Sequence, residues 1–415
     1  MYVRHLTLRN FRNYADAELS LDVGVQVFEG ANGQGKTNLV EAIGYLATLS
    51  SHRVSSDAAL VRFGEKSAIV RAELAHRNRT LAIDVELQKS GANRARVGGQ
   101  PVRARELSRY FTTVLFAPED LALVRGEPQQ RRDFFDSLLV THSSRLGDVL
   151  QQYDRVLRQR NSLLRSAKSQ RLDASALTTL EIWDEQLIAH GSVIIAERLA
   201  LVERLVPHLQ DAYESLVDDN HHPGLSMRVT ALADGGRLMD DDQTGEQRGT
   251  VTLAEIESRF AERLRAARDK ELERGVTLVG PHRDDVTFWL NQLPARITAS
   301  HGESWSFALS LKLAAAQLVR SESRTGDPVL ILDDVFAELD AARRQRLAAA
   351  IAGFEQVLIT CAVLTDIPEP LREHTIHIRA GKIIDREDAS AAGELAAADS
   401  GARTTAEQQA ERSDD

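Results

Sequence analysis

The sequence predicts an α/β protein in which a unit with a mixed sheet is interrupted by a second, mainly helical unit. Short segments with alternating or continuous apolar residues, the patterns of β-strands, fill the first hundred residues and return toward the end of the chain. Between them, apolar residues recur at three- and four-residue spacing, which places them on one face of long helices. Two such helical stretches could pair as an antiparallel hairpin.

The boundaries of these units follow from where the spacing changes. We expect the α/β unit to comprise residues 1–115 and 276–385, and the helical unit to comprise residues 116–275. Residues 221–250 are rich in Gly, Asp and Gln, which favours a flexible insertion. Residues 386–415 consist mainly of Ala, Ser, Asp and Glu without periodicity, so we expect an acidic, disordered tail.

Composition favours a soluble protein of the cytoplasm. Hydrophobic residues make up 43% of the chain and charged residues 27%, the balance of a globular protein. Residues 1–10 alternate apolar and charged side chains, and no later apolar run is long enough for a bilayer, so we expect neither a secretory signal nor a membrane partner. Cys361 is the only cysteine, which excludes an intrachain disulfide and fits a reducing compartment.

The formal net charge of −10 argues at first sight against a nucleic-acid partner. Residues 385–415, however, contain nine acidic residues against three arginines and therefore carry −6 of that charge. The remaining body then carries a net charge of −4 (−10 less −6), and its basic side chains can still gather on one face.

A phosphate-binding loop is expected between an apolar strand pattern and a helix pattern. The motif G-x-x-x-x-G-K-[ST] is matched in full by Gly30, Ala31, Asn32, Gly33, Gln34, Gly35, Lys36 and Thr37, with Asn38 following as a further expected nucleotide contact. Backbone amides of such a loop turn inward around phosphate, and the helix N-terminus adds its dipole. Lys36 would reach the β- and γ-phosphates as a catalytic residue, and the Thr37 hydroxyl would bind Mg²⁺. The motif therefore predicts ATP and Mg²⁺ as cofactors.

Two acidic residues follow a second apolar run, Val-Leu-Ile-Leu at 329–332. Such a run is typical of a buried parallel strand, and ligands bind at the carboxyl ends of these strands. We expect Asp333 to be the Mg²⁺-side carboxylate, acting directly or through a water. Asp334 would be the catalytic base that orients and deprotonates the attacking water.

The segment near residue 300 predicts the type of ATPase. Ser300 and Gly302, with Glu303 next, precede a long amphipathic pattern one helix upstream of the Asp333 strand. This is the place of the ABC signature, whose helix N-terminus serves the nucleotide of a second subunit, so two chains would enclose two ATP molecules. Asp340 resembles the loop that crosses the same interface. The alternative is an ordinary helix N-cap, and the segment could pack with the helical unit.

The order of these and other blocks resembles the RecF family of bacterial DNA gap-repair proteins. The resemblance covers most of the chain and is carried by residues 8–14, 33–39, 116–121, 159–164, 280–285 and 332–340. The segment from Ser300, SHGESW, is similar to an actinobacterial form of the signature. The resemblance implies a compact head like that of SMC proteins, which dimerises with ATP and binds gapped DNA at single-strand/double-strand junctions. It also implies action with RecR and RecO in loading RecA, with hydrolysis resetting the dimer.

Three departures from the usual ABC pattern predict slow hydrolysis. Asp334 stands where Glu is usual, and Glu303 stands where Gln is usual. Thr360 and Cys361 occupy the place of the switch histidine. A shorter base and a missing imidazole are compatible with slow switching and not with rapid transport.

Candidate DNA contacts lie mainly on the first helical stretch. They are six basic side chains: Arg155, Arg158, Arg160, Arg165, Lys168 and Arg171. They could form a phosphate-contacting stripe or only a solvated helix face. A second, turn-rich candidate contains Arg94, Arg96, Arg103 and Arg105.

Other functions remain open from the sequence. His282 could lie near the nucleotide or brace a turn. A transporter ATPase subunit would co-purify with a membrane protein, an SMC-like ATPase with a nuclease would need a further acidic cluster, and a non-hydrolysing module would show no turnover.

Overall fold

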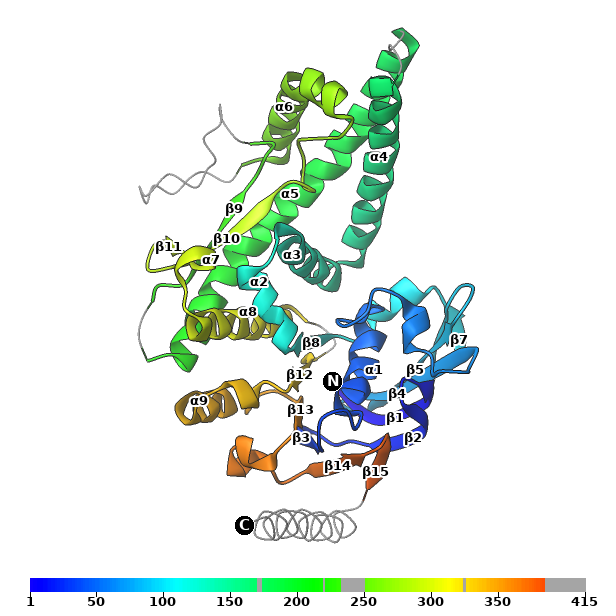
Figure 1. Ribbon diagram of the computed structural model, residues 1–415, viewed down its shortest axis with the longest axis vertical. Helices are drawn as coiled ribbons and strands as arrows, with labels where there is room; N and C mark the ends of the chain where they lie inside the picture. Colours follow the sequence, from blue (N-terminus) through cyan, green and yellow to red (C-terminus); the bar gives the residue numbers. More distant parts are fainter. Residues whose placement is uncertain (170–173, 219–220, 233–250, 324–325, 385–415) are drawn as a thin grey trace, which may run out of the picture. The chain divides into compact units, whose positions relative to one another are not determined.

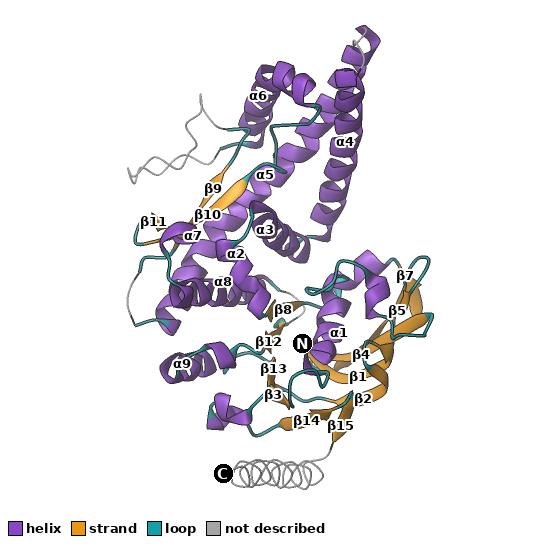
Figure 2. Cartoon of the chain, in the orientation of Figure 1, coloured by secondary structure: helices purple, strands orange, loops and turns teal. Residues whose placement is uncertain are grey.

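A computed structural model describes residues 1–169, 174–218, 221–232, 251–323 and 326–384. The chain forms two compact units: unit 1 comprises Met1–Leu107, Leu115–Ala117 and the chain from Asp327, and unit 2 comprises Ser108–Val114 and Pro118–Gly326. Unit 1 contains most of the strands and unit 2 most of the helices (Figure 1, Figure 2). Residues 276–326, expected in the α/β unit from their sequence, lie in unit 2, because strand β10 and helix α8 within this segment pack against unit 2 elements.

Unit 1 is built on two sheets. The first is antiparallel, with the order β2 (Tyr14–Ser20), β1 (Tyr2–Phe11), β4 (Ser67–His76), β5 (Arg79–Gln88), β6 (Arg94–Val97) and β7 (Gln100–Val102). The second has the order β15 (Lys382–Ile384), β14 (Thr375–Arg379), β3 (Gly24–Glu29), β13 (Gln356–Cys361), β12 (Val329–Asp333) and β8 (Thr113–Phe116). In it β14, β3, β13 and β12 are parallel and β15 is antiparallel, which confirms the expected mixed sheet.

Helix α1 (Lys36–Thr48) connects the two sheets of unit 1. It contacts β12 and β13 of the second sheet and β1, β4 and β5 of the first. Ten of its thirteen residues are buried, so the helix is covered on nearly all sides. The other helical segments described in this unit are α9 (Ala341–Ile351), the first part of the 3₁₀ turn η2 (Ala104–Arg109), and the short 3₁₀ turns η1 (Asp57–Leu60), η5 (Phe336–Glu338), η6 (Leu364–Asp366) and η7 (Glu369–Leu371).

Unit 2 is mainly helical. Its helices are α2 (Leu121–Arg125), α3 (Pro128–His142), α4 (Ser144–Ser169), α5 (Ala174–Leu216), α6 (Leu253–Arg274), α7 (Ala295–Thr298) and α8 (His301–Glu322). Helix α5 packs against α4, α6 and α8, in agreement with the expected helical pairing. A small antiparallel sheet contains β9 (Gly224–Arg228), β10 (Asp285–Leu290) and β11 (Leu293–Pro294). Among the described residues, every helix is too short or too polar to cross a membrane.

The expected insertion at 221–250 is wrong for its first part. Residues Gly224–Arg228 form β9 beside β10, and Val229, Ala231 and Leu232 are buried. Thr230 binds the Asp284 carboxylate through both its backbone amide and its hydroxyl, at 2.8 and 2.7 Å. The segment pairs with a strand more than fifty residues away, which its composition does not show. The rest of the expected insertion and the acidic tail lie outside the described residues.

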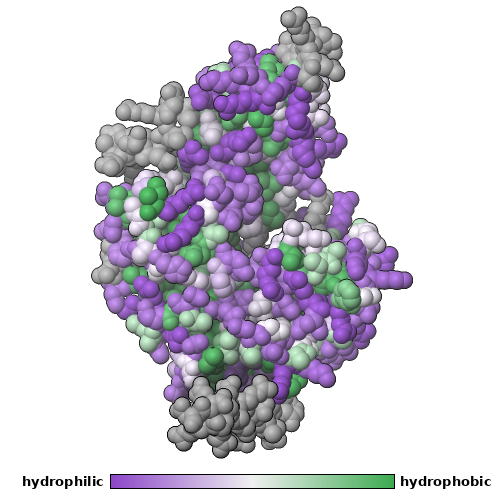
Figure 3. Space-filling model, in the orientation of Figure 1, coloured by the Kyte–Doolittle hydropathy of each residue, from purple (hydrophilic) through white to green (hydrophobic). Residues whose placement is uncertain are grey.

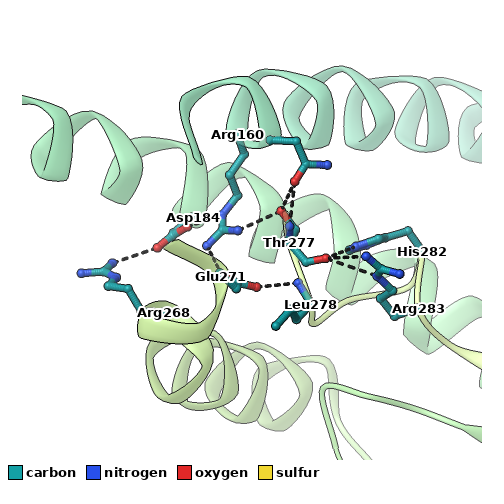
Figure 4. Close-up of polar contacts among 9 residues, drawn as sticks. Arg160, Asp184, Arg268, Glu271, Thr277, Leu278, His282 and Arg283 are labelled. Carbon is teal, nitrogen blue, oxygen red and sulfur yellow. Dashed lines mark hydrogen bonds and ion pairs between the residues drawn. The ribbon is translucent and has the colours of Figure 1, made fainter. Parts of the chain in front are cut away.

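Arg160 is the centre of a buried ion cluster, and its predicted role as a DNA contact is wrong. Its guanidinium is 0% exposed and donates to Asp184 at 2.6 Å, to Glu271 at 2.7 Å and to Thr277 at 2.8 Å (Figure 4). Arg268 donates to the second oxygen of Asp184 at 2.9 Å. The cluster ties α4 to α5, α6 and the segment that follows α6, so Arg160 is a structural cation.

Replacing Arg160 by methionine should strongly destabilise unit 2. The change leaves Glu271 buried without its cation and deprives Asp184 of one of its two arginines, which costs about 3–5 kcal/mol in buried pairs. The apparent free energy of unfolding in urea, followed by circular dichroism, measures this loss. Arg158→Ala, on the exposed face of the same helix, is the matched control and should change stability by about 0.5 kcal/mol or less. Equal effects of the two variants would contradict the structural role.

His282 braces a turn in unit 2 and is buried among polar groups. Its ring fits a neutral imidazole in which Nδ1 accepts from the Tyr153 hydroxyl at 2.6 Å and Nε2 donates to the Thr277 carbonyl at 3.3 Å. Burial lowers the pKa of His282 to about 4. Burial also raises the pKa of the nearby Asp284 carboxyl to about 6. Burial therefore favours the neutral form of both side chains.

These two pKa shifts predict opposite contributions to acid stability. Between pH 6.5 and 4 the unfolded chain protonates His282 while the folded chain does not, so stability is lost as the pH falls through this window. Between pH 6 and 3.8 the folded chain holds a proton on Asp284 that the unfolded chain has released, so stability is gained. His282→Gln should make the loss of stability between pH 6.5 and 4 shallower, and Asp284→Asn should make it steeper. Unfolding curves at several pH values that stay parallel to the parent would contradict both assignments.

Candidate nucleotide site

The expected phosphate loop lies between β3 and α1, at the carboxyl end of the second sheet of unit 1. Gly35, which immediately precedes α1, has φ of +116°, a conformation that L side chains rarely adopt. A Cβ atom at this position would lie 2.6 Å from the Asn13 side-chain nitrogen and 3.0 Å from the Tyr14 hydroxyl. Both the backbone angle and the close neighbours therefore require glycine here.

Residues at two hairpin connections, one between β1 and β2 and one between β14 and β15, donate hydrogen bonds to this loop. Asn13, between β1 and β2, and Tyr14, the first residue of β2, donate to the carbonyls of Gln34 and Gly35, each at 3.1 Å. The backbone amides of Ala380 and Gly381, between β14 and β15, donate to the Gln34 side chain at 2.6 Å and to its carbonyl at 2.9 Å. These contacts fix the loop before any ligand arrives. The motif itself gives no sign of them.

Lys36 begins α1, and its side chain turns back over the loop. The residue is 4% exposed, and its ammonium donates to the Ala31 carbonyl at 3.3 Å. Within the described part of the chain this ammonium has a single, long hydrogen bond, so it is poorly satisfied and favours an anionic ligand. This placement fits the expected phosphate contact.

Asp333 is the buried acid at the end of β12. Its Oδ1 atom accepts from the Thr37 hydroxyl at 3.0 Å and from the Thr360 hydroxyl at 2.6 Å. Burial raises the pKa of Asp333 despite these hydrogen bonds, and the charge of Asp334 acts in the same direction. A carboxylate beside a hydroxyl is a hard oxygen pair of the kind that Mg²⁺ prefers, and a cation would offset the cost of the buried charge. Thr37 and Asp333 therefore fit the predicted metal site.

Asp334 follows in a strained backbone conformation. Its φ is +53°, in the left-handed region, and its amide donates to the Thr360 hydroxyl at 2.9 Å. Such strain persists where surrounding contacts fix it and is common at functional sites. Thr360 thus holds both acids: its hydroxyl donates to Asp333 and accepts from Asp334. The sequence pattern drew attention to Thr360 only because it stands where the switch histidine is usual. It gave no sign of these two hydrogen bonds.

Asn38 braces the loop from α1. Its amide donates to Asn13 at 2.8 Å, and its carbonyl oxygen accepts from Arg53 at 3.0 Å. Both ends of the amide are therefore used by the protein, so a nucleotide contact of Asn38 stays a prediction.

The signature residues begin α8 in unit 2. Ser300 caps this helix by accepting from the Glu303 amide at 3.2 Å, and the Glu303 carboxylate accepts from the Ser300 amide at 2.7 Å. Gly302 is the second residue of the helix. This reciprocal capping box is a local reason for glutamate at position 303. Ser300 is therefore an N-cap, which is the alternative that the sequence left open. In unit 1, Asp340 caps α9 by accepting from the Arg343 amide at 2.9 Å. Contacts of these residues with a second chain remain predictions.

The remaining basic candidates differ in exposure. Arg155, Arg158, Arg165 and Lys168 are exposed on α4, whereas the side chain of Arg171 lies outside the description. In the second candidate, Arg94 lies 3.6 Å from Glu86, and Arg96 is paired across the strands with Asp84. Acidic neighbours thus offset the charge of Arg94 and Arg96, which leaves α4 as the better candidate.

The second sheet, the loop between β3 and α1 and the paired acids after β12 define an ABC-type ATPase, and the expected fold class is confirmed. A family model described as the RecF/RecN/SMC N terminal domain matches residues 2–367. The chain is 55% identical over 399 residues to the DNA replication and repair protein RecF of Clavibacter sepedonicus, covering 95% of this chain and 98% of that protein. This chain belongs to the RecF family, as its sequence blocks predict.

Two solved structures of the recombination mediator protein RecF in the RecFOR pathway support this placement. One is RecF-ATPrS, with a TM-score of 0.80, and the other is RecF-ATP, with a TM-score of 0.77. Each is 28% identical to this chain and covers 92% of it, and this chain covers 97% and 98% of the two structures.

Thr360→Val should disable the site without unfolding the protein. Valine keeps the shape but removes the hydroxyl that joins Asp333 and Asp334, and the loss of such a supporting contact typically costs 10- to 100-fold in activity. Steady-state ATP hydrolysis measures the effect, and Thr360→Ser, which keeps the hydroxyl, is the matched control. Undiminished turnover of Thr360→Val would show that Thr360 is dispensable.

Proposed function

We propose that this chain is an ATP- and Mg²⁺-dependent DNA-binding protein of gap repair and replication. It dimerises when ATP binds, attaches to gapped DNA at single-strand/double-strand junctions, and helps to load RecA in the cytoplasm. RecR and RecO are the partners that its family implies. The observation that carries this proposal is the hydrogen-bonded group of Thr37, Asp333 and Thr360 beside a complete phosphate loop in a RecF-family chain.

The nucleotide roles follow from the positions in unit 1. The loop of Gly30 to Gly35 would cradle the phosphates with its backbone amides, and Lys36 would neutralise them. Mg²⁺, held by Thr37 and Asp333, would supply electrostatic stabilisation of the transferring phosphoryl group. Asp334, one residue beyond, would orient the attacking water and accept its proton.

Hydrolysis should be slow for reasons that are visible in the site. The Asp334 side chain is one methylene shorter than the usual glutamate, and its backbone is fixed by Thr360. The end of β13 offers a hydroxyl, already engaged by both acids, in place of an imidazole. Slow turnover suits a clamp whose ATP-bound state must last while other proteins act.

The dimer would form through the start of α8. Ser300, Gly302 and Glu303 would approach the nucleotide held by a second copy, with Asp340 crossing the same interface. Two apolar side chains just before Ser300 are solvent-exposed: Leu293 at 52% and Ile297 at 82%. Figure 3 shows apolar atoms on the surface around β11 and α7. Exposed apolar groups next to the signature support a protein contact there.

DNA would bind through electrostatic contacts of the exposed α4 face. Arg155, Arg158, Arg165 and Lys168 can neutralise phosphates without reading sequence, so binding should weaken steeply with salt. A junction is then recognised by shape and by the dimer, and not by base contacts.

Binding to gapped duplex DNA tests the proposal. The parent should bind fluorescent gapped DNA tightly with ATP and Mg²⁺ and weakly with ADP, while light scattering shows a dimer only with ATP. Lys36→Met should lose ATP binding, dimerisation and tight DNA binding together, because the ammonium that neutralises the phosphates is gone.

Lys66→Met is the matched control, since Lys66 is exposed in the same unit and outside the loop. It should behave as the parent. DNA binding that is absent in every nucleotide state would refute the gap-repair role and leave an ATPase with another client. Tight ATP-dependent DNA binding without turnover would instead identify a non-hydrolysing clamp.

A further inference from the structure

Hydrogen bonds to a second buried carboxylate, that of Glu41, hold the loop that follows α1. Glu41 of α1 is 1% exposed and receives both ends of the Arg12 guanidinium, at 2.8 and 2.7 Å. The Ser51 hydroxyl donates to the same carboxylate at 2.5 Å and accepts from the amides of Arg53 and Val54 at 3.0 and 3.1 Å. Despite the cost of burial, Arg12 and Ser51 lower the pKa of Glu41, so the carboxylate stays charged. Residues 51–54 are therefore held in one conformation.

This conformation places His52 beside Asp333. The His52 side chain is 19% exposed, and its Nε2 atom lies 4.0 Å from Oδ2 of Asp333. The other oxygen, Oδ1, accepts both threonine hydroxyls. The two oxygens of Asp333 thus have different neighbours. Oδ1 accepts hydrogen bonds from Thr37 and Thr360, and Oδ2 lies near His52. A separation of 4.0 Å is too long for a direct hydrogen bond, and Nε2 is buried from solvent, so a small movement of the ring would bring the two atoms into contact.

The same loop also touches the phosphate-loop helix. Arg53, the next residue, donates to Asn38, which in turn donates to Asn13 beside the loop. His52 is consequently fixed relative to both Asp333 and the phosphate loop. An ordinary surface histidine would not be tied to the site by neighbours on each side.

We propose that His52 is a positioning residue of the ATPase site, whose Nε2 comes within hydrogen-bonding distance of Oδ2 of Asp333 and orients it when Mg²⁺ is bound. The site would then contain an imidazole that comes from the loop after α1. The usual ABC pattern has its histidine at the end of the strand equivalent to β13, where this chain has Thr360. This inference rests on the proposed nucleotide function and adds a residue to it. His52 acts on the metal-side acid and does not itself contact the reacting atoms.

Three substitutions at His52 separate positioning from packing. The amide nitrogen of glutamine can occupy the place of imidazole Nε2, whereas asparagine reaches only the place of Nδ1. His52→Ala and His52→Asn should lower kcat about 10- to 100-fold with little change in KM, as expected when a supporting contact to a metal ligand is lost. His52→Gln should restore turnover to within a few-fold of the parent.

A second measurement does not depend on hydrolysis. The Mg²⁺ concentration that supports half-maximal binding of a fluorescent ATP analogue should rise about 10- to 100-fold in His52→Ala and His52→Asn, and should be nearly restored in His52→Gln. His5→Ala is the matched control, because His5 lies on β1 in the same unit and its ring contacts Ser20 at 3.3 Å. Thermal melting in the absence of nucleotide shows whether each variant is folded.

Parent-like kcat and Mg²⁺ dependence in His52→Ala would overturn the inference, and so would equal rescue by asparagine and glutamine. Lys36→Met distinguishes this result from failure of the proposed function. If Lys36→Met abolishes ATP binding while His52→Ala changes nothing, only the role of His52 is wrong. If Lys36→Met binds and hydrolyses ATP normally, the nucleotide site itself is wrong.

Discussion

The buried carboxylate of Asp333 is the constraint on which the site of unit 1 depends. It joins the first turn of α1, through Thr37, to the ends of the neighbouring strands β12 and β13, through its own position and Thr360. A charge that is only 4% exposed costs folding free energy, and its raised pKa reflects that cost. The protein tolerates it because Thr37 and Thr360 hydrogen-bond this one group beside the phosphate loop. In the proposed function, this cost in stability falls at the point where a cation would bind.

Local patterns predicted the fold class and the phosphate loop because their causes are local. A strand, a glycine-rich turn and a helix are contiguous at residues 24–48, so spacing alone shows them. The roles of Ala380 and Gly381 were not predictable, because their partner Gln34 lies more than three hundred residues away in the sequence. The role of Thr360 was not predictable either, because its partners Asp333 and Asp334 belong to another strand. Strand β9 was missed for the same reason: its pairing with β10 compensates for a sequence of low apolar content.

Arg160 shows a signal that was present and not used. It lies four residues after Val156 and four before Leu164, both buried, so it falls within the apolar stripe of α4. An arginine in such a stripe predicts buried acidic partners, which Asp184 and Glu271 provide. The exposed face of a long helix therefore has to be separated from its buried face before basic residues are counted as DNA contacts. Ser300 is a similar case, since the hydroxyl predicted to contact the nucleotide of a second chain already caps α8.

The hairpin of β14 and β15 has a consequence for synthesis of the protein. Its turn donates two backbone amides to Gln34, so the phosphate loop near the amino terminus is completed by residues 380 and 381. Asp333 and Thr360, which form the hydrogen-bonded group with Thr37, also follow the loop by about three hundred residues. A growing chain made from its amino terminus carries the whole loop motif early, yet lacks groups that shape it until residues 380 and 381 have been added. The loop would therefore reach its final form long after its own residues have been made.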